Sequence, residues 1–313
     1  MSRAFVFPGQ GSQAVGMGAA LAEAFGAARE VFEEVDEALS QRLSKLMFEG
    51  PESDLTLTEN AQPALMAVSM AAVRVLEREA GLRLADKADF VAGHSLGEYS
   101  ALAAAGSMSL GDAARLLKRR GQAMQAAVPV GEGAMAALLG LDLEAAAQVA
   151  EEAAQGEVCA PANDNAPGQV VISGAKAAVE RAIELAASKG ARRAILLPVS
   201  APFHCALMAP AADEMGSALA ETMLKPPHIR LVANVTASAV EDVEDIRPLL
   251  VHQVTGMVRW RESVLYMKDC GVGTLVELGA GKVLSGLARR IDRELTGINA
   301  GTPEEIEALI KTL

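Results

Sequence analysis

Residues 89–105 read DFVAGHSLGEYSALAAA: a short apolar run, then a serine between two glycines, then a segment of small residues. The run from Asp89 to Gly93 is typical of a buried strand, and the segment from Leu96 to Ala105 predicts a helix. The junction Gly93-His94-Ser95-Leu96-Gly97 has the G-x-S-x-G pattern of a nucleophile elbow, a sharp strand-to-helix turn that exposes a serine hydroxyl. The sequence therefore predicts an α/β fold with a reactive serine.

The flanking segments extend this pattern. Arg3 to Phe7 predicts a short buried strand that enters a turn-rich loop, residues 8–13. Apolar residues at three- and four-residue spacings then predict three helices, over residues 18–35, 61–79 and 107–127. Ser109 is the expected N-cap of the third helix, with Asp112 as its partner. These elements suit a large α/β-hydrolase-like core with a parallel sheet and many helices.

The stretch from Gly131 to Val199 has a different pattern. Its predicted strands are residues 133–139, 158–160, 169–173 and 193–199, and its predicted helices are residues 143–155 and 175–189. The order β-α-β-β-α-β is the ferredoxin-like pattern, which folds as a compact α+β unit. We therefore expect residues 131–199 to form a small subdomain inserted between the two parts of the large one, residues 1–130 and 200–313.

Composition narrows the class of protein. The 313 residues are 51% apolar but only 3% aromatic, so aliphatic side chains must fill the core. The formal charge of −12 argues against a general affinity for nucleic acid or anionic membranes, because both need concentrated Lys and Arg. We therefore expect neither as a partner.

Cysteine usage and hydropathy indicate the compartment. Cys159, Cys205 and Cys270 are an odd number without C-x-x-C spacing, which indicates neither a disulfide framework nor a zinc site. Gln10 interrupts the apolar start before a secretory core can form, and charges such as Arg74 break the longest apolar stretches. We expect a cytoplasmic protein with no metal.

A serine hydroxyl needs a base near neutral pH, and histidine is the usual one. His94 adjoins Ser95, but neighbouring side chains around an elbow point in different directions, so packing or a local hydrogen bond is expected for it. His228 follows two prolines and is expected in a surface turn. A loop just after the insert could carry His204 over the elbow, whereas His252, on a helical segment, is the competing candidate. With no carboxylate in an obvious pattern, a backbone carbonyl is expected to orient the base.

Several motifs follow one another along the chain: FPGQGSQ at 7–13, GHSLGEY at 93–99, Arg120-Gly121, NAPGQVV at 165–171, PFH at 202–204, NVT at 234–236, Gln253, VRW at 258–260, and ELG at 277–279 with Gly281. Together they resemble the motifs of the malonyl-CoA:acyl carrier protein transacylases and the related acyltransferase domains of fatty acid and polyketide synthases. The likeness covers nearly the whole chain. Several separate motifs in one order are more specific than any one of them.

The resemblance implies roles for individual residues. Ser95 is implied as the nucleophile and His204 as the general base. Gln253 is implied as the residue whose backbone carbonyl orients the histidine, and Gln10 and Leu96 as the source of the oxyanion-hole N–H groups. The implied reaction is ping-pong: malonyl-CoA forms a malonyl-serine ester and releases coenzyme A, and the phosphopantetheine thiol of acyl carrier protein takes the acyl group for fatty acid synthesis. No cofactor is implied.

Arg120 has a chemical argument of its own. A malonyl group ends in a carboxylate, and a guanidinium binds carboxylates through two parallel hydrogen bonds. The alternative is that Arg120, in Lys118-Arg119-Arg120 near a predicted helix end, only compensates the helix dipole. The resemblance favours carboxylate binding. Phe203 and Leu96 further resemble the malonyl-selective rather than the methylmalonyl-selective pattern of the family.

Two other functions use the same residues. A serine hydrolase would use the same elbow, although the acid that such enzymes place between serine and histidine is not recognisable here. A non-enzymatic binding module would need none of Ser95, His204 and Arg120. For an acidic carrier protein, the doublets at 192–193 and 289–290 are candidate basic docking residues, and the alternative is that they only solubilise exposed faces.

Overall fold

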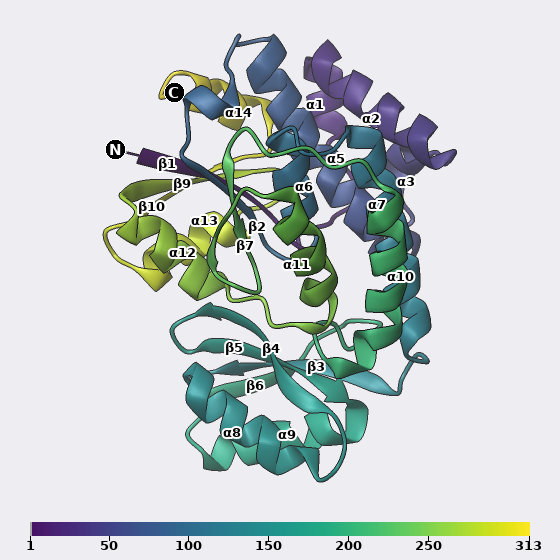
Figure 1. Cartoon of the computed structure of the whole chain (residues 1–313), viewed down its shortest axis with the longest axis vertical. Coiled ribbons are helices and arrows are strands. Elements are labelled where there is room, and N and C mark those ends of the chain that lie inside the picture. The colour runs from purple at the N-terminus through teal and green to yellow at the C-terminus, as the bar shows by residue number, and fades with distance from the viewer. Residues whose placement is uncertain (1) are drawn as a thin grey trace.

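A computed structural model describes residues 2–313 and contains two β-sheets (Figure 1). The larger sheet has the strand order β10-β9-β1-β2-β7-β8. Its strands are β1 (Ser2–Phe7), β2 (Phe90–Gly93), β7 (Arg230–Ala233), β8 (Ser238–Val240), β9 (Val272–Leu278) and β10 (Thr296–Ala300). All neighbours are parallel except β8, which pairs antiparallel with β7 at the edge. The predicted α/β class with a parallel sheet is confirmed.

Helices bury both faces of this sheet, so its strands are apolar on both sides. Alternate residues of β1 point to opposite faces: Phe5 and Phe7 enter one core, and Ala4 and Val6 enter the other. The first core is shared with α2 (Gly26–Leu39), α5 (Thr58–Arg78), α6 (Gly97–Ala104), α7 (Leu110–Ala127), α10 (Ala209–Glu221), α11 (Val243–Thr255) and α14 (Pro303–Ile310). The second core is shared with α12 (Trp260–Asp269) and α13 (Val283–Ile291).

The helix predicted over residues 18–35 is two helices. α1 (Ala19–Ala24) ends at Phe25, whose extended backbone separates it from α2. The short helices α3 (Leu43–Glu49) and α4 (Glu52–Thr56) follow. The helices predicted over 61–79 and 107–127 are confirmed as α5 and α7. Ser109 caps α7 as predicted, because its side chain accepts a hydrogen bond from the Asp112 N–H at 3.0 Å.

The second sheet lies at the lower end of the molecule in Figure 1, with the order β4-β5-β3-β6. Its strands are β3 (Gly133–Leu139), β4 (Cys159–Ala166), β5 (Gln169–Ala175) and β6 (Arg193–Leu196), and α8 (Leu143–Ala154) and α9 (Lys176–Ser188) cover its outer face. The predicted order β-α-β-β-α-β is therefore confirmed. β4 extends six residues beyond the predicted Ala160, and β6 ends three residues before Val199.

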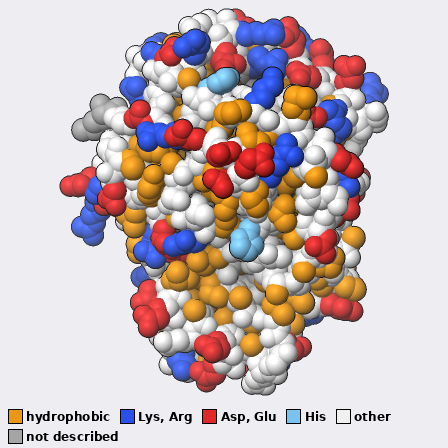
Figure 2. All heavy atoms as spheres, in the orientation of Figure 1, with side chains coloured by type: hydrophobic (Ala, Val, Ile, Leu, Met, Phe, Trp, Pro, Cys, Tyr) orange, Lys and Arg blue, Asp and Glu red, His pale blue; other side chains and the backbone are white. Residues whose placement is uncertain are grey.

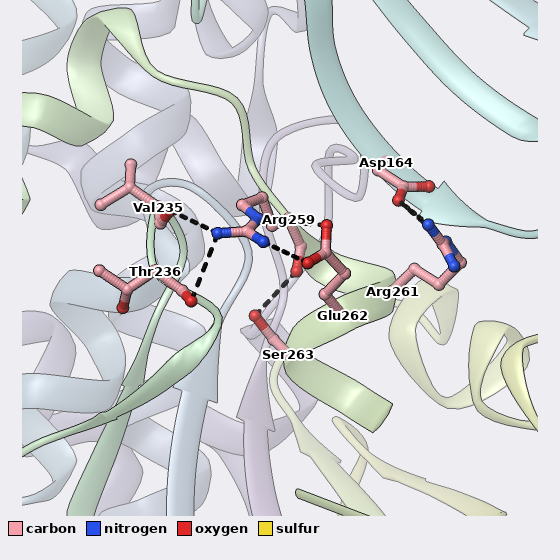
Figure 3. Close-up of polar contacts among 7 residues, drawn as sticks. All are labelled: Asp164, Val235, Thr236, Arg259, Arg261, Glu262 and Ser263. Carbon is pink, nitrogen blue, oxygen red and sulfur yellow. Dashed lines mark hydrogen bonds and ion pairs between the residues drawn. The ribbon is translucent and has the colours of Figure 1, made fainter. Parts of the chain in front are cut away.

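The small sheet is attached to the large one through the segment before and within α12 (Figure 3). Val258 exchanges two backbone hydrogen bonds with β4, from its N–H to Ala162 (2.9 Å) and from the Asp164 N–H to its own carbonyl (3.0 Å). Arg261 forms an ion pair with the buried Asp164 carboxylate at 2.8 Å. On the other side, Arg259 pairs with Glu262 and donates to carbonyls of the turn after β7. One short segment thus holds β4 against the large sheet.

Acidic and basic side chains are interspersed among apolar ones on the face shown in Figure 2. On that face of the described chain, no continuous basic surface of the kind that binds nucleic acid phosphates is present. Within residues 2–313, no helix is long and apolar enough to cross a bilayer.

Candidate active site

Ser95 lies in a strained turn between β2 and α6. Its φ of +53° is in the left-handed region, which residues other than glycine seldom adopt. The two glycines of the motif make this turn possible. A Cβ on Gly93 would lie 1.9 Å from the carbonyl carbon of Gly97, and one on Gly97 would lie 2.3 Å from the Phe7 carbonyl oxygen. The elbow predicted from the sequence therefore packs directly on the end of β1, and its serine is held in a fixed orientation.

Two side chains from distant segments satisfy the backbone of Ser95. The Asn234 Oδ1 accepts from the Ser95 N–H at 2.8 Å, and the Asn234 amide donates to the Gly93 carbonyl at 2.7 Å. The Gln253 side-chain amide donates to the Ser95 carbonyl at 3.0 Å. Sequence reasoning gave Asn234 no role. Its position directly after β7, the neighbour of β2 in the sheet, is the signal that places it beside the elbow.

His204 meets the serine directly. Its Nε2 is 2.7 Å from the Ser95 Oγ, and its Nδ1 is 2.8 Å from the Gln253 carbonyl oxygen and 3.1 Å from that of Gly256. Nδ1 therefore carries the proton, which leaves the Nε2 lone pair for the serine hydroxyl. His204 also has a positive φ, +59°, so both members of the pair sit on strained backbone. Backbone carbonyls, not a carboxylate, orient this histidine.

The electrostatic environment keeps His204 neutral. Burial, and then the positive charge of Arg120, lower the pKa of its imidazole to about 3. The hydrogen bonds to the Gln253 and Gly256 carbonyls oppose this shift only in part. The histidine is thus unprotonated, and ready to accept a proton, throughout the neutral range.

Two residues at the cavity around Ser95 have backbone N–H groups with no acceptor among the described residues. Gln10 and Leu96 both line the cavity around Ser95, and neither N–H donates to any acceptor within residues 2–313. They come together because β1 and β2 pair in parallel, with Phe7 opposite Gly93, so the loop after β1 adjoins the elbow. The N-terminus of α6 adds its dipole at the same point. The Ser95 N–H, in contrast, already donates to the Asn234 Oδ1.

Arg120 lies on α7 and is only 1% exposed. Its guanidinium donates to the Gln62 Oε1 at 2.7 Å, the Gln253 Oε1 at 2.9 Å and the Ser95 Oγ at 3.2 Å. Burial lowers the pKa of the guanidinium, which nevertheless stays ionised because arginine titrates far above neutrality. A fully buried arginine beside the serine does not fit the alternative of a surface residue that only offsets a helix dipole.

These side chains surround one cavity of about 580 Å³. The part of the chain that holds the large sheet contributes Ser95, His204, Arg120, Gln10 and Leu96, together with Gln62, Met124 and Phe203. The part that holds the small sheet contributes Met135, Asn163 and residues 197–199. The cavity therefore lies between the two sheets, with Ser95 on one wall. Its volume is in the range of small-molecule sites.

The other histidines lie outside the reacting pair. His94 is partly buried, and its Nε2 is 2.8 Å from the Asn165 Oδ1, which ties the elbow to β4. His252, the competing candidate for the base, lies on α11 and does not line the cavity. His228 precedes β7, and its N–H donates to the Ala105 carbonyl. In the described part of the chain, no group of three or more His, Cys, Asp or Glu is placed to hold a metal ion.

Glu98 is a buried carboxylate that the sequence reasoning did not single out. It is 1% exposed on α6, and its Oε2 accepts from the Asn234 N–H at 3.0 Å and from the Gln253 Nε2 at 2.9 Å. Burial raises its pKa to about 7.

Comparison with known proteins finds relatives that match the chain over nearly its whole length. Residues 4–295 match the model of the acyl transferase domain. The malonyl CoA-acyl carrier protein transacylase of Bacillus subtilis is 48% identical over 99% of this chain and 96% of its own. An acyl-carrier-protein S-malonyltransferase from Bartonella henselae superposes with a TM-score of 0.97 at 59% identity, covering 100% of this chain and 99% of its own. A malonyl-transacylase solved in complex with its type II polyketide synthase acyl-carrier protein gives a TM-score of 0.96 at 43% identity, covering 100% of both chains.

Proposed function

The chain belongs to the acyl transferase family, and we propose on that premise that it moves a malonyl group from malonyl-CoA to the phosphopantetheine thiol of an acyl carrier protein. The observation that carries the proposal is the position of Arg120, a buried guanidinium within 3.2 Å of the serine oxygen. A malonyl ester on Ser95 can place its free carboxylate on this guanidinium, whereas an acetyl ester has no carboxylate to bind there.

The first half-reaction loads the serine. The Ser95 Oγ attacks the thioester carbonyl of malonyl-CoA while its proton passes to the His204 Nε2, 2.7 Å away. The N–H groups of Gln10 and Leu96 hold the negative oxygen of the tetrahedral intermediate. As the carbon–sulfur bond breaks, the imidazolium returns the proton to the departing coenzyme A sulfur. The product is a malonyl-serine ester.

The second half-reaction transfers the malonyl group from the serine to the carrier protein. The carrier thiol gives its proton to the same Nε2, its sulfur attacks the ester carbonyl, and the serine oxygen leaves with the proton that His204 returns. Because one base and one oxyanion hole serve both halves, the two substrates bind in turn and ping-pong kinetics follow. No cofactor takes part, since coenzyme A and phosphopantetheine are carried by the substrates.

Malonyl binding also strengthens the base. After burial, the charge of Arg120 is the largest cause that lowers the pKa of His204. A malonyl carboxylate on Arg120 offsets that charge and raises the pKa of His204 toward its ordinary value. The histidine is then a better proton acceptor in the malonyl-enzyme, when the carrier thiol must be deprotonated.

The small subdomain, for which we propose the bounds 131–199, shields the ester from water. It contributes Met135, Asn163 and residues 197–199 to the cavity wall. The β4 contacts with Val258 and Arg261, and the His94–Asn165 hydrogen bond, hold it over the elbow. Exclusion of water favours transfer over hydrolysis. Phe203 narrows the same cavity, in keeping with a preference for malonyl over the bulkier methylmalonyl group.

The partner in this proposal is a holo acyl carrier protein that acts in the cytoplasm, and its malonyl form supplies extender units for fatty acid synthesis. Neither nucleic acid nor membrane is involved. Arg192, Arg193, Arg289 and Arg290 are exposed, and none of them forms an ion pair with another residue in the range 2–313. Four unpaired guanidinium groups are available to dock an acidic carrier.

Transfer of labelled malonyl from malonyl-CoA to holo carrier protein tests the proposal. Double-reciprocal plots at several carrier concentrations should be parallel, and Ser95→Ala and His204→Ala should each reduce transfer by about 10³-fold or more. Intersecting plots, or malonate released at a rate that the carrier does not change, would contradict the proposal and favour a hydrolase.

A further inference from the structure

Glu98 is buried at the active site, yet the two half-reactions do not use it. Its carboxylate lies beneath the elbow, where it accepts only from neutral donors, the Asn234 N–H at 3.0 Å and the Gln253 Nε2 at 2.9 Å. Those two residues in turn hold the N–H and the carbonyl of Ser95. An amide side chain at position 98 could accept the same two hydrogen bonds. These two hydrogen bonds therefore do not explain why position 98 carries an ionisable carboxyl group.

Arg120 has the complementary property. It is as deeply buried as Glu98, but all its hydrogen-bond acceptors are neutral: Gln62, Gln253 and the Ser95 hydroxyl. Across the described residues, no carboxylate lies within ion-pair distance of it. A buried, uncompensated cation is strongly unfavourable, because burial removes the water that would solvate its charge.

The Gln253 side chain joins the two charges. Its Oε1 accepts from Arg120 at 2.9 Å, and its Nε2 donates to Glu98 at 2.9 Å, so the amide dipole is aligned between cation and anion. A direct Glu98–Arg120 ion pair would occupy the guanidinium fork and compete with an incoming carboxylate. Separation by one amide keeps the charge compensation without placing a carboxylate of the protein on the guanidinium, which lines the cavity.

We propose that Glu98 is the counter-ion of Arg120 in the free enzyme. When malonyl-CoA binds, the malonyl carboxylate takes over as the counter-ion and Glu98 takes up a proton. The proposal rests on the proposed function, because it takes Arg120 as the site of the malonyl carboxylate. Glu98 is a positioning residue, since it touches neither the substrate nor the reacting atoms. Two carboxylates facing one guanidinium repel each other, so the substrate carboxylate binds best when Glu98 is neutral.

The sign of the pH effect follows from the groups around Glu98. The ionisable groups that act on it are Arg120 from α7 and Tyr99 from its own helix, while the segments of Asn234 and Gln253 present amides. Because its pKa is raised to about 7, Glu98 is protonated below neutrality and ionised above it. The KM for malonyl-CoA should therefore rise as pH rises through the neutral range. His204, with a pKa of about 3, does not titrate there.

The experiment measures serine loading from malonyl-CoA and from acetyl-CoA between about pH 6 and about pH 8, in wild type and in Glu98→Gln. In wild type the KM for malonyl-CoA should rise about three- to tenfold across this range relative to that for acetyl-CoA, which has no carboxylate. In Glu98→Gln the malonyl KM should be independent of pH and close to the wild-type value at low pH. Glu77→Gln, an equal charge change at an exposed position on α5, should retain the wild-type profile.

Wild type alone can overturn the inference, even if Glu98→Gln does not fold. A ratio of malonyl to acetyl KM that stays constant from about pH 6 to about pH 8 would show that no neighbouring carboxyl competes for Arg120. A wild-type pH dependence that persists in a folded Glu98→Gln variant would assign it to another group. If wild type forms no malonyl-serine at all, the proposed function itself is wrong, which is a different result.

Discussion

Replacement of Arg120 by glutamine separates carboxylate recognition from catalysis. Glutamine retains hydrogen-bonding groups near Gln62 and Gln253 but removes the buried charge. A hydrogen bond to a charged group contributes about 1.5–3 kcal/mol, and loss of one partner of a buried ion pair costs about 3–5 kcal/mol. A loss of about 3–4 kcal/mol in the transition state for malonyl transfer corresponds to a fall of about 10²- to 10³-fold in kcat/KM. Loading from acetyl-CoA should change by less than about threefold, because no carboxylate is present.

The adjacent arginine provides a matched control. Arg119 lies on the same helix, but it is partly exposed and forms ion pairs with Glu214 and Glu221, both on α10. Exposed ion pairs contribute about 1 kcal/mol or less, so Arg119→Gln should leave both acyl donors within about threefold of wild type. Initial rates of serine loading from malonyl-CoA and acetyl-CoA give the comparison. An equal fall for both donors in Arg120→Gln would refute the reasoning, because it would mean that Arg120 only supports the Ser95 hydroxyl.

Three further predictions concern the base, the elbow and the docking surface. Since the pKa of His204 in the free enzyme is about 3, kcat/KM for loading should fall in acid only below about pH 5, and a half-maximal kcat/KM near the ordinary histidine pKa of 6.5 would contradict this. Gly97→Ala would place a Cβ 2.3 Å from a carbonyl oxygen at the end of β1, so its unfolding free energy should fall by about 3 kcal/mol in denaturant titrations, whereas Gly286→Ala, with no neighbour within 4 Å, should not destabilise. Charge reversal of the doublets at 192–193 and 289–290 should raise the KM for carrier protein and weaken its salt dependence without changing malonyl loading; an unchanged carrier KM would exclude these residues from docking.

Local patterns predicted much of the architecture. The β2–elbow–α6 junction follows from residues 89–105, because an apolar run, a glycine-bounded serine and a small-residue helix each have a local signature. The β-α-β-β-α-β order of residues 133–196 follows for the same reason, because each of its elements has its own periodicity. The break at Phe25 was not visible, because residues 18–35 keep helical spacing across it, and the extended backbone there depends on how α1 and α2 pack.

The hydrogen bonds that support Ser95 and Arg120 could not be predicted from local sequence patterns. Asn234 reaches Ser95 only because β7 pairs with β2, and that pairing joins residues well over one hundred positions apart. Glu98 directly follows the elbow, within GHSLGEY, but its burial and its link to Arg120 through Gln253 depend on the packing of α6, α7 and α11 against one another. Spacing along the chain carries no signal for such contacts, whereas the serine and the histidine are of types that chemistry alone singles out.

The most direct test of the central claim is the mass of the protein after incubation with malonyl-CoA in the absence of carrier, followed by identification of the modified peptide. The account predicts one added malonyl group, located on Ser95, absent from Ser95→Ala, and discharged by holo carrier protein much faster than by water. An adduct on another residue, or an ester on Ser95 that carrier protein and water discharge at the same rate, would contradict it.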